Sequence, residues 1–459
     1  GIAALTATFG AVALTPRAQR APATPHDVPG VTIPQLDAQY WIDRLAHPDR
    51  VVLNADAILA QNTRMRASDP ALHDLEALPP TLEAGRVRAW IEALSVPPTR
   101  TLYDADGKPG SPRSIDRMVA NLALKAIPQT QVTRYGMVVR RADLRTFPTR
   151  LRVFHSPDDH DIDRFQESAL FPGTPVVIAH ESRDRAWYFV VSETYAAWIE
   201  KDAVAQGDAD AIFNYGRRLP YLVVTGATAS TTFTPEAPAV SAVQLEMGVR
   251  VPILPDWPGD APVNGQHPYA SHVVELPVRN ADGNLAFQPA LVRRSADVTE
   301  GYLPLTRANL LRQSFKFLGE RYGWGHGYNA RDCSGFVGEI HRSFGILLPR
   351  NTRDQSVSPA LDRIAFSADD SHARRLKALR ETQVGDLVYI PGHVMMIIGH
   401  VDGEPYAIHD TSGMTYRLET GALRRLHLNG VSVTTILPML SDADTPTVDR
   451  ITSIQRIRR

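Results

Sequence analysis

Cys333 is the only cysteine among the 459 residues of this chain. A single cysteine excludes a framework of intramolecular disulfides, and it excludes a zinc site built from several thiolates. The fold must therefore be held together by hydrophobic cores, and a chain of this length suggests about three or four domains. A lone cysteine is most often a small buried apolar side chain, so its sequence neighbours decide whether it is reactive.

The composition is that of an ordinary globular protein without an excess of charge. Charged residues make up 22% and the net charge is -1, so no overall basic field exists to attract nucleic acid or an anionic membrane. The 35 prolines favour loops and short strands over long helical bundles. The histidines lack zinc-ligand spacing and no glycine-rich phosphate loop is present, so we expect no metal and no other cofactor.

The beginning of the chain predicts export. Residues 1–14 are small and apolar, but they are too few to span a bilayer, which takes about 20 residues. Residues 1–30 resemble the remainder of a signal-peptide core followed by a proline-rich linker, which predicts a periplasmic or cell-envelope location. A disordered terminus is the alternative. No later stretch is apolar enough for a membrane helix, so we expect no integral membrane segment in the mature chain.

The residue patterns change along the chain and predict a multidomain α+β protein. Helical spacing of apolar residues dominates first, then short β-branched and aromatic runs, and finally a mixture of both. The expected units after the linker are a helical N-terminal domain over 31–127, small β-barrels over 128–205 and 206–304, and an α+β domain over 305–459.

Individual elements can be placed within these units. We expect helices over 82–94, 114–126, 311–322 and 334–344, and apolar residues 51–59 also fall near helical spacing. We expect strands, among others, over 151–154, 174–179, 186–191, 222–224, 231–234, 386–390, 394–398 and 406–409. The turn residues over 280–284 are a strong hairpin signal.

Cys333 is expected at the beginning of the helix over 334–344. The N-terminus of a helix carries a partial positive charge and unpaired N–H groups, which favour the thiolate. The Cys333 N–H can also help to hold a tetrahedral oxyanion. His393 begins one predicted strand and His409 ends the next, so antiparallel pairing can bring the two imidazoles together. This set suits a thiol nucleophile, a base and a group that orients the base.

Motifs over about residues 305–440 resemble those of the NlpC-type cell-wall cysteine peptidases. In chain order they are Tyr322-Gly-Trp-Gly, Asp332-Cys-Ser-Gly, Gly385-Asp-Leu-Val-Tyr-Ile with Gly392-His-Val, and Ile408-His. That family has a papain-like core and cleaves the peptide stems of bacterial peptidoglycan. The resemblance implies that Cys333 is the nucleophile, His393 the base and His409 the orienting residue.

The same resemblance assigns further residues around the nucleophile. It implies that the Tyr322 hydroxyl lies near Cys333 and that Asp332 helps to hold a free amine of the substrate. Ser334 and Trp324 are assigned to substrate binding on the same basis. His326 stands where the family often has a second glycine, so the loop there is expected to differ in shape.

The upstream units resemble those of a four-domain subgroup, in which a helical region and two SH3-like barrels precede the papain-like peptidase domain. This subgroup is similar to γ-D-glutamyl-L-diamino acid endopeptidases that act on stems with a free N-terminal L-Ala. In such enzymes the first barrel borders the active-site cleft, and we expect Glu167 and Tyr195 to contact the substrate ammonium. The alternative is that both are exposed barrel residues without a ligand.

Two departures and two competing functions follow from the sequence. Met395-Met396 replaces a usual small residue, and a charged insertion over 356–382 either borders the cleft or forms a surface loop. A related murein amidase or acyltransferase on the same core is the first alternative function, and a catalytically idle wall-binding protein is the second. The expected partner is peptidoglycan or murein peptides, as intact sacculus or as free fragments.

Overall fold

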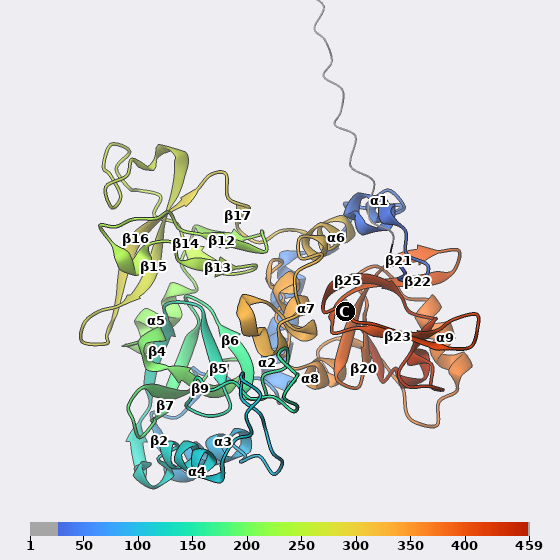
Figure 1. Ribbon diagram of the computed structural model, residues 1–459. Helices are drawn as coiled ribbons and strands as arrows, with labels where there is room; N and C mark the ends of the chain where they lie inside the picture. The colour runs from blue at the N-terminus through green and yellow to red at the C-terminus, as the bar shows by residue number, and fades with distance from the viewer. Residues whose placement is uncertain (1–25, 458–459) are drawn as a thin grey trace, which may run out of the picture.

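The computed structural model describes residues 26–457, and its two largest sheets have 7 and 6 strands (Figure 1). The apolar run expected to be a signal-peptide remnant falls within residues 1–25 and lies outside the described residues. Among the described residues, no helix has both the length and the apolar character needed to cross a membrane.

The helical N-terminal region is divided between two hydrophobic cores. Trp41 and Met65 are buried in one cluster with Phe336 of the C-terminal domain, whereas Val87 and Ile91 are buried against the first barrel. Figure 1 shows α1 and α2 beside the C-terminal domain and α3 and α4 beneath the first barrel. The elements are η1 (Ile33–Leu36), α1 (Ala38–Ile42), β1 (Val51–Leu53), α2 (Ala55–Ser68), β2 (Thr81–Glu83), α3 (Ala84–Leu94), α4 (Pro112–Asn121) and η2 (Leu124–Ala126).

The first barrel is the 7-stranded antiparallel sheet, in the order β10-β4-β7-β8-β9-β5-β6. Successive side chains of its strands point alternately into two buried hydrophobic clusters. Apolar residues of α3 and α4 belong to one of these clusters. The elements here are β3 (Thr130–Val132), which pairs with β2, and β4 (Arg134–Val138), β5 (Ala142–Arg145), β6 (Gln166–Leu170), β7 (Pro175–Glu181), β8 (Trp187–Val191), β9 (Ala196–Glu200), η3 (Lys201–Ala203), β10 (Val204–Gly207) and α5 (Ala209–Tyr215).

The region after α5 has its own core of short strands and one long hairpin. The predicted turn over 280–284 joins the hairpin strands, and Gly283 takes a positive φ of 88° there. The elements are β11 (Tyr221–Val224), β12 (Thr228–Ser230), η4 (Pro238–Val240), β13 (Gln244–Glu246), β14 (Arg250–Pro252), η5 (Pro268–Ala270), β15 (Ser271–Arg279), β16 (Leu285–Arg293) and β17 (Val298–Glu300).

The C-terminal domain packs α6 and α7 on one face of a sheet ordered β19-β27-β20-β21-β22-β25. Strands β20, β21 and β22 form the predicted antiparallel meander. The elements are β18 (Leu305–Thr306), α6 (Arg307–Phe315), η6 (Trp324–Asn329), α7 (Cys333–Arg342), α8 (Thr352–Val357), β19 (Asp362–Ala365), α9 (His372–Arg380), β20 (Leu387–Ile390), β21 (His393–Val401), β22 (Glu404–Thr411), β23 (Met414–Arg417), β24 (Leu423–Leu426), β25 (Gly430–Thr435), β26 (Met439–Leu440), η7 (Thr447–Arg450) and β27 (Ser453–Arg456).

Several predicted elements differ in the structure. The helix expected over 311–322 ends at Phe315, because Gly319 has a φ of 83° and the following residues pair with 429–431 as extended chain. Residues 51–53 form strand β1 instead of a helix, and β1 pairs with β18. No strand forms over 151–154. The carbonyl oxygen of Leu151 accepts a hydrogen bond from the Arg145 side chain there. No strand forms over 231–234 either.

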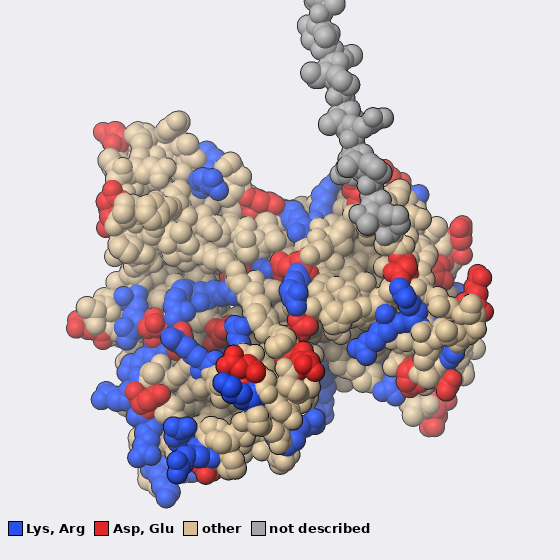
Figure 2. Space-filling model, in the orientation of Figure 1, with Lys and Arg blue, Asp and Glu red and all other residues tan. Residues whose placement is uncertain are grey.

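Charge is unevenly distributed although the net charge is -1. On the face in Figure 2, Lys and Arg side chains gather over α3, α4 and the first barrel, whereas the region of β15 and β16 is mostly uncharged. The N-terminal helices and the first barrel therefore present the more basic part of this face.

Candidate active site

Helix α7 begins at Cys333 because Asp332 caps it. The Asp332 side chain accepts a hydrogen bond from the Gly335 N–H at 2.8 Å, which satisfies one of the free donors of the first turn. Cys333 is buried, with 5% of its surface exposed. Its sulfur lies 3.6 Å from the Thr352 hydroxyl and 4.0 Å from the carbonyl oxygen of Gly392, the residue before His393. The helix thus delivers the sulfur to the backbone beside His393.

The protonation state of Cys333 differs from the sequence-based expectation. Burial raises the pKa of the thiol to about 11, and the nearby Asp332 carboxylate adds to that increase. The Thr352 hydroxyl and the Val394 N–H lower the pKa by smaller amounts. At neutral pH the sulfur therefore carries its proton, because burial outweighs the position at the helix N-terminus.

His393 and His409 are brought into direct contact by the pairing of β21 with β22. His393 Nε2 lies 2.7 Å from His409 Nδ1, and His409 Nε2 lies 2.9 Å from the Thr434 hydroxyl. Burial lowers the pKa of His393 to about 4, and burial together with the nearby His393 holds the pKa of His409 well below its ordinary value, so both imidazoles are neutral at pH 7. A neutral imidazole can accept a proton. Because His393 Nε2 is engaged by His409, which is in turn held by Thr434, the nitrogen of His393 that is free to accept a proton is Nδ1.

No hydrogen bond joins the Cys333 sulfur to either imidazole within the described part of the chain. The pair is therefore a neutral thiol and a neutral base, and not a preformed ion pair. Proton transfer from sulfur must then accompany the attack on a substrate carbonyl.

Tyr322 is buried within electrostatic reach of Cys333. Its side chain is 8% exposed. Burial, and then the charges of Cys333, Asp332 and Asp410, raise its pKa, so the hydroxyl keeps its proton and can donate a hydrogen bond. Asp410 was not predicted as a site residue from the sequence. It is fully buried directly after His409, and that adjacency was the only available signal.

Asp332 is held by protein donors on both oxygens. One oxygen accepts from the Gly335 N–H, and the other accepts from the Gly325 N–H at 3.0 Å and from Arg350 at 2.9 Å. Burial opposes ionisation, but Arg350 and His326 keep the pKa of Asp332 below its ordinary value. Arg350 also donates to the Ser334 hydroxyl at 2.9 Å, so Ser334 lies in the same network.

The first barrel contributes residues to the same place. The Tyr195 hydroxyl donates to Glu167 at 2.5 Å, and Thr146 donates to the other Glu167 oxygen at 2.5 Å. The electrostatic influence of Arg350 and Asp332 reaches Tyr195, while burial raises the Tyr195 pKa. Arg350 also donates to Ser168 at 2.7 Å. The two expected barrel residues thus contact each other, and Tyr195 lies within electrostatic reach of Arg350 and Asp332.

The loop before Asp332 explains how the barrel is attached. Trp324 is 37% exposed, and its indole N–H donates to the Gln166 carbonyl at 3.1 Å. His326 is buried with a φ of 61°, and its imidazole lies 2.9 Å from both Glu339 and Arg350. The histidine that replaces a usual glycine therefore joins η6 to α7.

The remaining departures have structural roles elsewhere. The insertion over 356–382 supplies β19, which pairs with β27 at the sheet edge, and α9. Met395 and Met396 are both buried, on opposite faces of β21. Among the described residues, no group of three or more His, Cys, Asp or Glu is placed to hold a metal ion.

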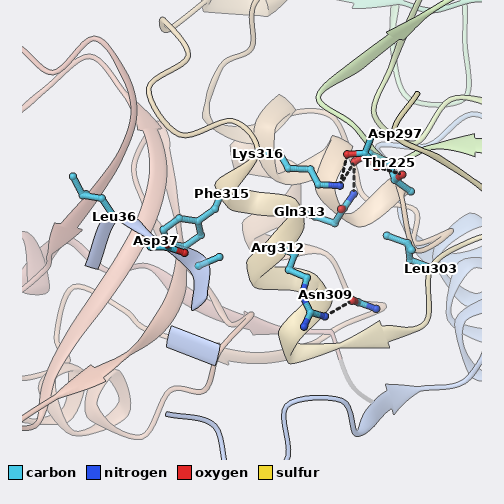
Figure 3. A pocket seen from close by; sticks show the side chains of 11 residues that line it. Leu36, Asp37, Thr225, Asp297, Leu303, Asn309, Arg312, Gln313, Phe315 and Lys316 are labelled. Carbon is cyan, nitrogen blue, oxygen red and sulfur yellow. Dashed lines mark hydrogen bonds and ion pairs between the residues drawn. The ribbon is translucent and has the colours of Figure 1, made fainter. Parts of the chain in front are cut away.

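A cavity of about 520 Å³ lies apart from these residues, where η1, α6 and the loop before β18 meet (Figure 3). Figure 3 shows Lys316 pointing towards Asp297 and Thr225, and the Lys316–Asp297 pair measures 2.7 Å. None of the predicted catalytic residues lines this cavity. Its polar contacts join α6 to the strands of the second unit.

Comparison with known proteins identifies two parts of the chain. The family model of the NlpC/P60 family matches residues 319–425, and the model of the SH3 domain (SH3b1 type) matches residues 152–200. A comparison with curated proteins found no match.

A solved structure shares the overall fold. The chain is similar to the NlpC/P60 endopeptidase from Photobacterium damselae subsp. piscicida, with 19% identity, a TM-score of 0.71 and coverage of 91% of this chain and 94% of that one. It is also similar to an NlpC/P60 family protein from Bacillus cereus ATCC 10987, with 18% identity, a TM-score of 0.46 and coverage of 71% of this chain and 100% of that one. The chain therefore contains a region that matches the SH3 domain (SH3b1 type) model and a C-terminal region that matches the NlpC/P60 family model.

Proposed function

We propose that the enzyme hydrolyses the γ-D-Glu–diamino acid amide bond of peptidoglycan stem peptides that begin with a free L-Ala. The observation that supports this proposal is the Glu167–Tyr195 pair of the first barrel, which lies within electrostatic reach of Arg350 and Asp332. A barrel at this position would leave little room beyond Asp332, so we expect the bound peptide to end there.

Glu167 is the carboxylate suited to the N-terminal ammonium. Both of its oxygens accept from hydroxyl groups, and no cation pairs with it in the described part of the chain. Asp332, in contrast, already binds Arg350 and two backbone N–H groups. A free ammonium would therefore pair with Glu167, and Asp332 would add to the negative potential around it.

The neighbouring cation suits the other charge of this substrate. A γ-linked D-Glu residue carries a free α-carboxylate close to the scissile amide. Arg350 is 10% exposed at its side chain and contacts Ser334, and the Thr352 hydroxyl lies 3.6 Å from the Cys333 sulfur. These donors fit a carboxylate held near the nucleophile.

The proposed reaction follows acyl transfer through a thioester. The Cys333 sulfur attacks the amide carbonyl carbon while His393 accepts the thiol proton, with its ring oriented by His409. The Cys333 N–H and the Tyr322 hydroxyl are placed to donate to the oxyanion. His393 then protonates the leaving amine, the C–N bond breaks, and water hydrolyses the thioester to release L-Ala-D-Glu.

Product analysis with defined peptides tests the proposal. The tripeptide L-Ala-γ-D-Glu-diamino acid should release L-Ala-D-Glu, and acetylation of its N-terminus should lower kcat/KM by about tenfold or more, because Glu167 would lose its charged partner. A Cys333→Ala variant provides the background rate. Equal cleavage of the free and acetylated peptides would contradict the ammonium pocket, and no release from either would contradict the bond assignment.

The substrate class implies where the enzyme acts. Mature peptidoglycan lies in the cell envelope, so we propose an exported enzyme of the periplasm or envelope. A closed cleft that requires a free N-terminus favours released fragments over the intact sacculus, in which L-Ala is amide-linked to the glycan. Digestion of purified sacculi, with and without prior amidase treatment, distinguishes these substrates: release only after amidase treatment is expected.

A further inference from the structure

A second polar cavity, of about 450 Å³, lies between residues 319–321 and the segment that leads into β25. Ser432 lines this cavity and pairs with His409 in the register of β22 and β25. Paired residues of antiparallel strands point to the same face of the sheet. Ser432 therefore lies on the strand next to that of His409, and neighbouring strands are about 4.8 Å apart. The cavity is thus adjacent to the imidazole pair.

Two residues that line this cavity, Arg321 and His427, lie close to the Asp161 carboxylate. Arg321 Nη2 lies 2.5 Å from Asp161 Oδ1, and His427 Nε2 lies 3.8 Å from Asp161 Oδ2. The side chains of Arg321 and His427 are 67% and 66% exposed, and that of Asp161 is 26% exposed. Exposed ion pairs contribute little to stability, so a ligand of matching charges can exchange with them at little cost.

The carboxylate of this pair comes from the first barrel. Asp161 lies in the loop between β5 and β6, and that loop is held to η6 by the Tyr328 hydroxyl, which donates to the His160 carbonyl. Burial opposes ionisation of Asp161, but its hydrogen bonds to Arg321 and Asn429 keep its pKa below the ordinary value. Arg321, a permanent cation in the cavity lining, thus has a fixed anion, Asp161, beside it.

Asn429 adds an unused acceptor. Its side-chain oxygen is buried and accepts no hydrogen bond from any described residue. A buried carbonyl oxygen without a donor is unfavourable, and a ligand ammonium would satisfy it. The lining therefore offers the Arg321 cation for a carboxylate, and the oxygens of Asp161 and Asn429 beside it become acceptors for an ammonium once the side chains shift towards a ligand.

We propose that this cavity binds the side-chain end of the diamino acid on the leaving side of the scissile bond, and that it favours an end bearing both an ammonium and a carboxylate. The inference rests on the proposed function. The ligand carboxylate accepts from Arg321 while the ligand ammonium donates to Asp161 and Asn429. An ammonium alone would separate Asp161 from Arg321 without giving Arg321 a new partner.

Tripeptides that differ only at this end test the subsite. The third residue is meso-diaminopimelate, whose side chain ends in both groups, or L-lysine, which has only the ammonium. The wild type should prefer the diaminopimelate tripeptide in kcat/KM by about tenfold or more, as expected for a charged hydrogen bond. Arg321→Met should lower this ratio about tenfold, and Asp161→Asn should lower kcat/KM for both tripeptides.

Matched controls separate a subsite from a structural role. Arg425→Met changes an exposed arginine on β24 outside the cavity and should leave the ratio unchanged. Amidation of the side-chain carboxylate of diaminopimelate should make the wild type treat that tripeptide like the lysine one. An Arg321→Met ratio equal to that of the wild type would overturn the inference, even where both rates fall. If the wild type cleaves neither tripeptide, the proposed function itself fails.

Discussion

Asp410 is a carboxylic acid held in the interior without a hydrogen-bond partner on either oxygen among the described residues. Burial, with the negative charges of Asp332 and Glu320, raises its pKa to about 9. An unfolded aspartate has a pKa of about 3.9, so between these two values the folded protein holds a proton that the unfolded chain has lost. Stability therefore falls as pH rises through that window.

Replacing Asp410 by asparagine should remove this dependence. The amide stays neutral at every pH, so Asp410→Asn should be more stable than the wild type by about 1–3 kcal/mol at pH 8 and by much less near pH 4.5. Urea unfolding at the two pH values measures the difference. Asp369→Asn, at an exposed position of the same domain, should follow the wild type. Parallel pH slopes for the wild type and Asp410→Asn would contradict this assignment.

The residue scale also shows which site residues the sequence can reveal. Cys333, His393 and His409 were identified because each lies in a contiguous motif. Arg350 and Asp410 were missed, because a buried cation that binds Asp332 and a buried neutral acid depend on contacts between distant segments. Burial likewise reversed the expected pKa shift of the thiol, and no local pattern encodes the depth of a side chain.

At the scale of elements, the first turn of α7 packs closely against the loop of η6. A Cβ at Gly335 would lie 2.3 Å from the His326 ring, and that ring is fixed by Glu339 and Arg350. The sequence predicted this helix almost to the residue, because its capping aspartate and apolar face are local. It did not predict that the helix packs against a histidine in a left-handed conformation.

Two glycines of α7 provide a matched pair. Alanine normally stabilises a helix relative to glycine by about 1 kcal/mol. Gly338→Ala, where a Cβ meets nothing within 4 Å, should therefore raise Tm. Gly335→Ala should lower Tm by an amount equivalent to about 1–3 kcal/mol, because the clash with His326 outweighs the helix preference, and it should also lower kcat/KM. Equal Tm shifts for the two variants would contradict the close packing seen here.

The whole molecule is organised around a junction of all three β-rich units. Arg141, from the first barrel, pairs with Glu246 of β13 at 2.9 Å and donates to the carbonyl oxygens of His326 and Ala330 at 2.7 and 3.0 Å. The Glu246 side chain is fully buried. The changing residue patterns along the chain could indicate the successive units. They could not show this junction, because Arg141 and its partners are 105 to 189 positions apart in the sequence.

Removing Arg141 should therefore weaken the enzyme as an assembly. Arg141→Met leaves Glu246 as a buried charge without its cation, which should destabilise the chain by about 3–5 kcal/mol. Because the same arginine holds the barrel that carries Glu167, KM for peptides with a free N-terminus should rise, as steady-state kinetics below the new Tm would show.

The neighbouring arginine distinguishes this junction from a general effect of charge. Arg140 forms ion pairs with Glu200 and Asp202 and has a side chain that is 42% exposed, so Arg140→Met should change stability by less than about 1 kcal/mol. In the double variant Arg141→Met with Glu246→Gln, the buried charge is absent, and much of the lost stability should return while KM stays high. If KM recovered together with stability, the barrel would be held in place by its apolar contacts, and Arg141 would serve only to neutralise Glu246.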